Sequence, residues 1–146
     1  MRTTTEILLV DDNPGDSDLT AEVLGRNGCP SHIQAVINGT EAITRLRRQG
    51  KYTDAIRPGL VILDLNLPGK DGRAVLAEVK ADPGLRQIPI VIFSTSEAPG
   101  DIMRSYELGA NSYVSKPGNL QDFISAVTAI GEFWFGFAHL PHQEEQ

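Results

Sequence analysis

Four short runs of apolar, mostly β-branched residues constrain the fold more than any other feature of the sequence. They occupy residues 7–10, 60–63, 90–93 and, more weakly, 112–114. Each run is continuous rather than alternating, which is typical of strands buried on both faces of a parallel sheet. A fifth run, residues 32–36, is polar enough to be an edge strand.

Helical patterns fill the segments between these runs. Apolar residues recur at helical spacing in residues 15–27, 40–49, 72–80, 99–108 and 119–130. Pro99 is suited to the first turn of its helix, and Asn119 to the cap of the last one. Five strand–helix repeats predict an α/β fold, in which a parallel sheet is covered by helices on both faces and joined by right-handed crossovers.

Length and charge limit what such a fold can do. A chain of 146 residues fits one domain with one hydrophobic core. Its net charge of -6 provides no basic footprint for nucleic acid or an anionic membrane. The single cysteine, Cys29, excludes an internal disulfide, and the N-terminal apolar stretch is too short for a signal peptide. We expect a cytoplasmic protein without direct contact to nucleic acid or membrane.

Polar residues follow the strands at their carboxyl ends, where open α/β sheets place their functional crevice. Asp11 and Asp12 follow the first strand, and Asp64 follows the third. At about 4 Å each pair of carboxylates would repel by roughly 4 kcal/mol at an effective dielectric near 20. A divalent cation relieves this repulsion, and oxygen ligands favour Mg²⁺, with Mn²⁺ as the alternative.

A carboxylate beside such an ion can act as the nucleophile in phosphoryl transfer. Asp64 stands alone on the central strand and is the natural nucleophile, whereas Asp11 and Asp12 are suited to hold the metal. Lys116, after the fifth strand, would supply a fixed positive charge, and Ser94, after the fourth, a hydroxyl donor. Each residue also has a plainer interpretation as a turn former, helix cap or solvated side chain. Those interpretations leave unexplained why all of these residues end neighbouring strands.

The motifs LLVDDN, VILDLNLPGKDG, IVIFSTS and YVSKP, in this order, resemble the receiver domains of two-component response regulators. The resemblance extends from residue 7 to about residue 130. It implies a (βα)5 fold of the flavodoxin-like, CheY-like type: a doubly wound, five-stranded parallel sheet with strand order 2-1-3-4-5. It also implies a phosphorelay protein that takes a phosphoryl group from a histidine kinase, and no enzymatic activity beyond its own Mg²⁺-dependent phosphorylation and dephosphorylation.

The resemblance assigns roles in the metal site residue by residue. Asp64 would be the phosphoacceptor and Asp12 a direct Mg²⁺ ligand. Asp11 would bind the metal through water, and the backbone carbonyl of Asn66 would complete the protein ligands. Lys116 matches the lysine that contacts the phosphoryl group, and the family pattern implies a cis peptide bond between Lys116 and Pro117.

The resemblance also implies a mechanism of signalling. Ser94 matches the switch hydroxyl of the family, and Tyr113 matches its rotating switch aromatic. Phosphorylation adds about one net charge to Asp64. Ser94 would then bond to the phosphoryl group, Tyr113 would turn inward, and the face made by the fourth and fifth helices and the fifth strand would change shape.

A smaller set of features is similar to stand-alone receivers that pair with phytochrome-type histidine kinases. These features are the long connection of residues 47–59, the PGD of residues 14–16, and the aromatic ending FWFGFAHLP. They imply a histidine kinase as partner, with a bacteriophytochrome as the candidate.

The aromatic ending suggests self-association. We divide the chain into a receiver domain, residues 1–130, and residues 131–146, which extend the last helix and end in a polar tail without an output domain. Helical spacing places Trp134 and Phe137 on one face, while Phe133 and Phe135 point elsewhere. One face can pack on the domain and the others need a partner, so we expect a homodimer through the last helix and the tail. The alternative is a tail that folds back on its own domain.

Two other classes of function remain open. A Mg²⁺-dependent phosphohydrolase also forms an aspartyl phosphate, but such hydrolases generally need an acid–base aspartate two residues after the nucleophile, where this chain has Asn66. A non-phosphorylated interaction module could use the same fold. The complete set of Asp11, Asp12, Asp64, Ser94 and Lys116 counts against it.

Overall fold

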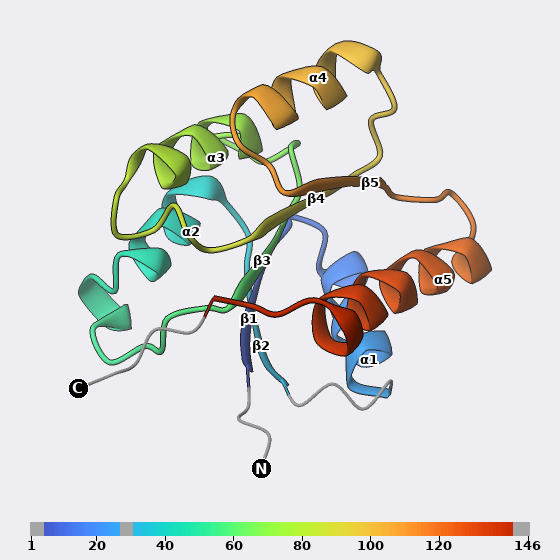
Figure 1. Cartoon of the computed structure of the whole chain (residues 1–146), viewed down its shortest axis with the longest axis horizontal. Coiled ribbons are helices and arrows are strands. Elements are labelled where there is room, and N and C mark those ends of the chain that lie inside the picture. The colour runs from blue at the N-terminus through green and yellow to red at the C-terminus, as the bar shows by residue number, and fades with distance from the viewer. Residues whose placement is uncertain (1–4, 27–30, 142–146) are drawn as a thin grey trace.

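The computed structural model describes residues 5–26 and 31–141 of the chain, and residues 1–4, 27–30 and 142–146 lie outside the description (Figure 1). The strands are β1 (Thr5–Val10), β2 (Ser31–Val36), β3 (Leu60–Leu63), β4 (Ile90–Ser94) and β5 (Ser112–Ser115). They form one parallel sheet in the order β2-β1-β3-β4-β5. The predicted doubly wound α/β fold and its strand order are therefore confirmed.

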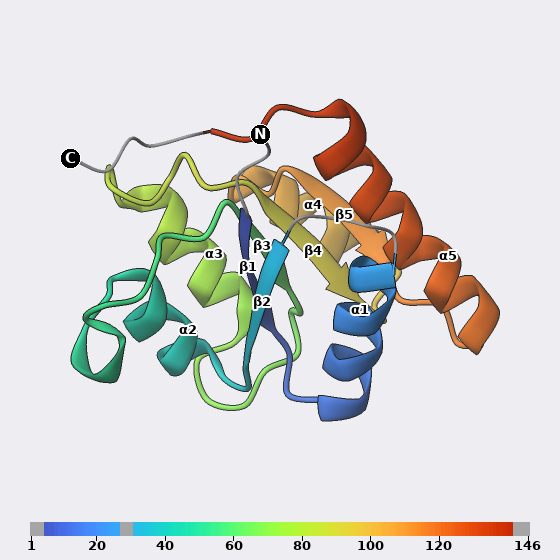
Figure 2. The ribbon, with the colours of Figure 1, turned by 90° about the horizontal axis from the view of Figure 1, so that it is seen from below.

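Helices cover both faces of this sheet, as the strand–helix alternation predicts. They are α1 (Pro14–Arg26), α2 (Gly39–Leu46), α3 (Gly72–Ala81), α4 (Pro99–Glu107) and α5 (Leu120–Gly131), with a short 3-10 helix η1 (Gly50–Tyr52) and a terminal π-helix η2 (Glu132–Phe137). Figures 1 and 2 show α1 and α5 on one side of the sheet, with α2 and α3 on the other. No helix within the described ranges is long and apolar enough to cross a bilayer.

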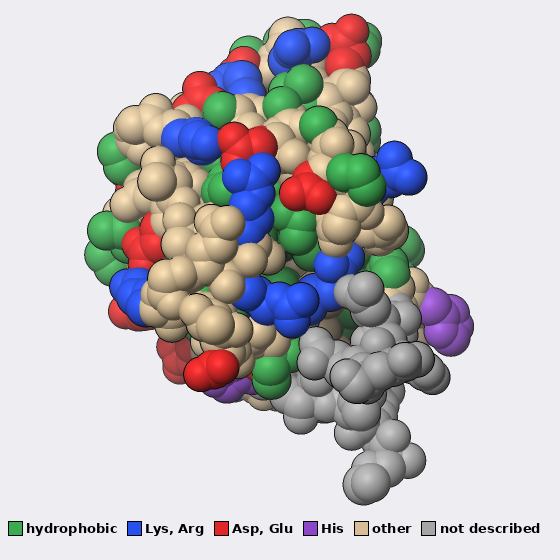
Figure 3. Space-filling view, turned by 90° about the vertical axis from the view of Figure 1, so that its left-hand side faces the viewer, with side chains coloured by type: hydrophobic (Ala, Val, Ile, Leu, Met, Phe, Trp, Pro, Cys, Tyr) green, Lys and Arg blue, Asp and Glu red, His purple; other side chains and the backbone are tan. Residues whose placement is uncertain are grey.

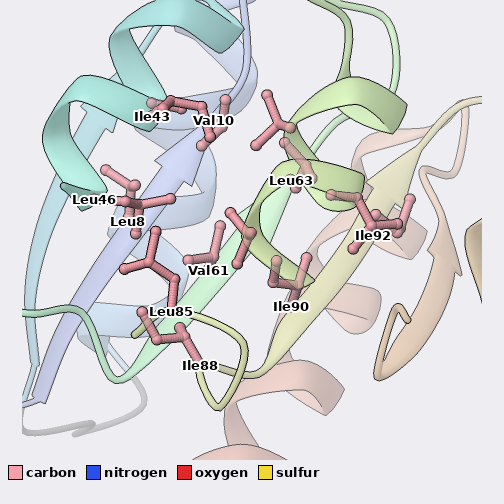
Figure 4. Packing of buried hydrophobic residues seen from close by; sticks show 14 of the residues in the cluster. Leu8, Val10, Ile43, Leu46, Val61, Leu63, Leu85, Ile88, Ile90 and Ile92 are labelled. Atoms are coloured by element: carbon pink, nitrogen blue, oxygen red, sulfur yellow. The ribbon is translucent and has the colours of Figure 1, made fainter. Parts of the chain in front are cut away.

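Alternate residues of the strands pack into two separate hydrophobic cores, one on each face of the sheet. Leu8 and Val10 of β1 pack toward α2 and α3, whereas Ile7 and Leu9 pack toward α1 and α5. Figure 4 shows the first core, in which side chains from β1, β3 and β4 meet those of α2. Because the strands are buried on both faces, their sequences are continuously apolar, and their polar residues stand at the ends.

The long connection of residues 47–59 is fastened to the domain by two arginines. Arg45 is 2% exposed and donates from Nη2 to the carbonyl of Ile56 at 2.7 Å. Arg57 donates from its guanidinium to the carbonyl of Gly84.

Between the connection and the end of α3 lies an open groove of about 340 Å³, to which Arg47, Arg48 and Arg57 contribute. Figure 3 shows Lys and Arg side chains gathered across one face of the molecule.

The aromatic ending departs from the predicted helical spacing. Trp134 and Phe135 pack against the core on the α1–α5 side, while Phe133 is 53% and Phe137 is 79% exposed. The expectation that Trp134 and Phe137 share one packing face is therefore wrong. The reason is that residues 132–137 form a π-helix, in which Ala138 N–H donates to Phe133 O five residues back, so α-helical spacing does not apply.

Candidate functional site

Strand register brings the predicted site residues to one edge of the sheet. Val10 of β1 lies opposite Leu63 of β3, which in turn lies opposite Ile92 of β4. Asp64, the residue that follows β3, donates its N–H to the carbonyl of Val10 at 2.9 Å. Because parallel strands all end in the same direction, Asp11 and Asp64 emerge at the same level.

Three carboxylates converge at this edge. Each of Asp11, Asp12 and Asp64 places a carboxylate oxygen within 4.8 Å of the other two. Asp11 and Asp64 are 9% and 7% exposed, while Asp12 is open to solvent. This donor set fits Mg²⁺ or Mn²⁺, because the ligands are all oxygen atoms and the exposed side of the cluster leaves room for water and a phosphoryl oxygen.

Two backbone N–H groups orient the buried carboxylates. The N–H of Asn13 donates to Oδ1 of Asp11 at 2.9 Å, and the N–H of Asn66 donates to Oδ1 of Asp64 at 3.1 Å. In each case the donor lies two residues after the aspartate, as in a local Asx turn. The loops after β1 and β3 thus hold one oxygen of each carboxylate, and Asp64 is left with its second oxygen for other contacts.

Lys116 offsets part of the negative charge of the cluster through direct contacts. Its Nζ lies 2.6 Å from Oδ2 of Asp11, 3.0 Å from Oδ2 of Asp64 and 3.0 Å from Oδ2 of Asp16. Burial acts to lower the pKa of Lys116, but hydrogen bonds to Asp11 and Asp64 outweigh it, so the pKa of this ammonium is raised. The pKa of Asp11 is also raised, because burial outweighs the opposing hydrogen bond from Lys116.

The backbone around Lys116 differs from the family pattern. Among the described residues there are no cis peptide bonds, so the expected cis bond between Lys116 and Pro117 is wrong for this structure. The trans backbone still delivers the lysine to the carboxylates. Its N–H donates to the carbonyl of Ser94 at 2.7 Å, which ties the end of β5 to the end of β4.

Asp16 is a site residue that the sequence reasoning missed. It lies in the first turn of α1, and its N–H donates to Oδ1 of Asn13 at 3.1 Å. Its carboxylate reaches Lys116 across 100 positions of sequence. The available signal was its place in the first turn of the helix that directly follows Asp11 and Asp12, which keeps it near the same sheet edge.

The two switch candidates meet at the loop after β4. Ser94 is fully buried, and its Oγ accepts a long hydrogen bond of 3.4 Å from the N–H of Ser96. The ring of Tyr113 packs against the core on the α2–α3 side, and its hydroxyl donates to the carbonyl of Ser96 at 2.8 Å. Tyr113 therefore already lies inward and partly buried in this structure, with its hydroxyl hydrogen-bonded to the loop that follows Ser94.

Comparison with known proteins agrees with this geometry. The model of the response regulator receiver domain matches residues 7–128. The response regulator Rcp1 of Synechocystis sp. (strain ATCC 27184 / PCC 6803 / Kazusa) is 44% identical over 135 residues, which cover 92% of this chain and 92% of that protein.

Solved structures show the same similarity. The phosphorylated cyanobacterial phytochrome response regulator RcpA has a TM-score of 0.93 and 46% identity, covering 96% of this chain and 100% of that chain. The Mn²⁺-bound form of response regulator Rcp1 has a TM-score of 0.91 and 43% identity, covering 94% and 99% of the two chains. The chain thus belongs to the response regulator receiver domain family, and its relatives include phytochrome response regulators.

Proposed function

We propose that this protein accepts a phosphoryl group from a histidine kinase on Asp64, with Mg²⁺ as cofactor, and signals through altered protein association. The observation that carries the proposal is the position of Asp64: it is 7% exposed, belongs to a three-carboxylate cluster, and has Nζ of Lys116 3.0 Å from Oδ2. The surroundings of Asp64 therefore bring together a nucleophilic carboxylate, a metal-binding cluster and a fixed cation.

The chemistry follows from these contacts. A carboxylate oxygen of Asp64 attacks the phosphorus of a phosphohistidine, so that a P–O bond forms and the P–N bond breaks. The electron pair of the broken bond leaves on the imidazole nitrogen of the kinase. Lys116 stabilises the negative charge on the transferred group, and the hydroxyl of Ser94 donates to one of its oxygens. Asn66 N–H keeps the carboxylate oriented throughout.

The metal would be held by Asp11, Asp12 and Asp64, with the backbone carbonyl of Asn66 as a further ligand. When bound, Mg²⁺ neutralises charge on the carboxylates and the phosphoryl oxygens. Mn²⁺ is the alternative, and the Mn²⁺-bound state of the relative Rcp1 supports a divalent cation in this family. The all-oxygen cluster supports the same ion class.

The proposed kinase is of the phytochrome type, with a bacteriophytochrome as candidate. Two observations support this partner. The chain is 46% identical to a phytochrome response regulator over nearly its whole length. It also carries the long connection of residues 47–59, fastened by Arg45 and Arg57.

The proposed output is a homodimer formed through α5 and residues 131–146, with residues 1–130 as the receiver domain. Leu120 at the start of α5 is 63% exposed, and Phe133 and Phe137 add two more exposed apolar side chains. Such side chains favour a protein partner. Residues 142–146 of the proposed extension lie outside the described residues.

Intact-mass measurement after incubation with acetyl phosphate and Mg²⁺ tests the phosphoacceptor. We expect one added phosphoryl group on the wild type, and none on Asp64→Asn or after removal of Mg²⁺ with a chelator. Asp54→Asn, which alters an exposed carboxylate away from the cluster, serves as control and keeps the adduct.

The other outcomes distinguish the alternatives. Absence of an adduct with both acetyl phosphate and a phosphorylated histidine kinase would leave the non-phosphorylated interaction module. Rapid turnover of general phosphomonoesters would instead identify a phosphohydrolase.

A further inference from the structure

Ser96, two residues after Ser94, links both switch candidates to α4. Its N–H donates to Oγ of Ser94 at 3.4 Å, and its carbonyl accepts from the hydroxyl of Tyr113 at 2.8 Å. Its own hydroxyl donates to Oδ2 of Asp101 at 2.6 Å and accepts from the N–H of Ala98 at 3.3 Å. Every polar group of this one loop residue is therefore engaged.

Asp101 extends the chain of contacts to α3. Its second oxygen, Oδ1, accepts from Nη2 of Arg73 at 2.6 Å. Arg73 follows Gly72, which packs so closely on the phosphoacceptor loop that a Cβ there would lie 2.2 Å from the carbonyl oxygen of Asp64. The three residues Arg73, Asp101 and Ser96, which we name the Asp101 latch, thus connect the backbone beside Asp64 to the loop that holds Ser94 and Tyr113.

Besides the Asp101 latch, few contacts fix the position of helix α4; one of them is the hydroxyl of Tyr106, which accepts from the N–H of Tyr113 at 3.1 Å. Ser105 is its one buried residue, while Met103 and Tyr106 are 64% and 48% exposed. The cap residue, Ala98, has no side chain to bond the first turn, so Asp101 in that turn reaches back to Ser96 instead. Because polar contacts of this kind exchange with water at small net cost, the latch holds α4 without making it immovable.

We propose that Asp101 is a positioning residue for phosphoryl transfer to Asp64, a role that rests on the proposed function. The latch fixes Ser96, and Ser96 in turn fixes the donor to Ser94 Oγ and the acceptor of the Tyr113 hydroxyl. The protein thereby maintains the inward arrangement of Tyr113 before any phosphoryl group arrives. A larger fraction of molecules is then ready to accept it.

A purely structural latch would behave differently from a positioning latch. If Asp101 only supported α4, its loss would lower the free energy of unfolding and leave the chemistry of intact molecules unchanged. If it positions the switch residues, its loss lowers the phosphorylation rate of fully folded protein. Mg²⁺ affinity stays constant, because the three latch residues are absent from the carboxylate cluster.

The chain offers a matched control for the test. Lys70 and Glu78 form an ion pair of 2.7 Å with side chains 31% exposed, and Arg73 and Asp101 form one of 2.6 Å with side chains 32% exposed. We would compare Asp101→Ala and Arg73→Gln with Glu78→Ala and Lys70→Gln. The measurements are the rate of phosphorylation by acetyl phosphate at saturating Mg²⁺, Mg²⁺ affinity by calorimetry, and thermal unfolding.

We expect Asp101→Ala to lower the rate about fivefold, the size of effect given by one charge-assisted hydrogen bond at a partly exposed site. Arg73→Gln should have a smaller effect in the same direction, and the control pair should keep the wild-type rate. Tyr113→Phe removes only the hydroxyl that bonds to Ser96. In the Tyr113→Phe background, Asp101→Ala should therefore lower the phosphorylation rate little further, because both changes interrupt the same chain of hydrogen bonds.

A second readout needs no phosphorylation. In NMR spectra of the unphosphorylated protein, Asp101→Ala should shift the ring signals of Tyr113 and the amide of Ser96, whereas Glu78→Ala should leave them in place. Unchanged NMR signals, or a phosphorylation rate equal to that of Glu78→Ala, would overturn the positioning role of Asp101. The proposed function would still stand in that case, provided that the wild type forms the phosphoryl adduct. A wild type that accepts no phosphoryl group would overturn both.

Discussion

Helices α4 and α5 flank β5 but are held to the domain by opposite means. Helix α5 buries Phe123, Val127 and Ile130 against the core on the α1–α5 side, and Asn119 caps its first turn. Helix α4 buries Ser105, lacks a side-chain cap, and is held by the hydrogen bonds of Asp101 and of the Tyr106 hydroxyl. The two helices, whose places in the fold Figure 1 shows, therefore differ in how much buried apolar surface anchors them.

The difference has a physical consequence for signalling. Moving α5 would expose buried aromatic and aliphatic surface, at roughly 25 cal/mol for each Å². Moving α4 exchanges hydrogen bonds within the protein for hydrogen bonds to water, which nearly balance. Under the proposed function, a charge placed on Asp64 would therefore shift the β4–α4 segment, while α5 would keep the surface on which a partner would bind.

The largest effect that separates the two helices should be on stability. Phe123→Ala removes a buried ring that packs 5.2 Å from the ring of Phe93, and we expect it to lower the free energy of unfolding by about 3–5 kcal/mol. Ile102→Ala, the corresponding truncation of a half-buried residue in α4, should cost about 1 kcal/mol. Urea unfolding measures both values. Equal losses would show that α4 is anchored as firmly as α5.

The fold and much of the site could be predicted because they depend on repetitive, local signals. Continuous apolar runs identify buried parallel strands. Because parallel strands end at the same edge of the sheet, they place Asp11, Asp64, Ser94 and Lys116 there regardless of the conformation of the loops. Side-chain identity and strand direction were enough for that conclusion.

The contacts that were missed depend on long-range geometry instead. Arg73 and Asp101 are 28 positions apart, and Lys116 and Asp16 are 100 apart, so no local pattern pairs them. Their pairing depends on helix placement and side-chain rotamers. The π-helix at residues 132–137 was missed for a related reason: the aromatic residues pack according to its spacing, whereas the prediction used the spacing of an α-helix.

A smaller effect should separate the helices in self-association. Replacing Phe133 and Phe137 with Ser removes exposed aromatic side chains from the proposed dimer surface, and we expect the dimer dissociation constant to rise about tenfold or more. Met103→Ser on α4 removes another exposed apolar side chain and serves as control; it should leave the constant unchanged. Sedimentation or light scattering across a concentration series measures the constant. A wild type that is monomeric at micromolar concentration would refute the dimer.

The smallest expected effect is a difference in how the two helices respond to acid. Hydrogen bonds from Ser96 and Arg73, with the charge of Arg73, hold the pKa of Asp101 below its ordinary value despite some loss of hydration. A carboxyl whose pKa is lower in the folded state stabilises the fold above its unfolded pKa of about 3.9, and this contribution is lost as the pH falls through the folded pKa. The latch should therefore stay closed at neutral and mildly acidic pH and open only in stronger acid.

Carbon-detected NMR should show the Asp101 carboxyl titrating below its ordinary range, and Arg73→Gln should move this titration to higher pH. Amide signals of α4 should follow this titration, whereas those of the α5 core face should not, because Phe123, Val127 and Ile130 carry no titratable group. An Asp101 titration that Arg73→Gln leaves unchanged would mean that the ion pair does not bias the latch.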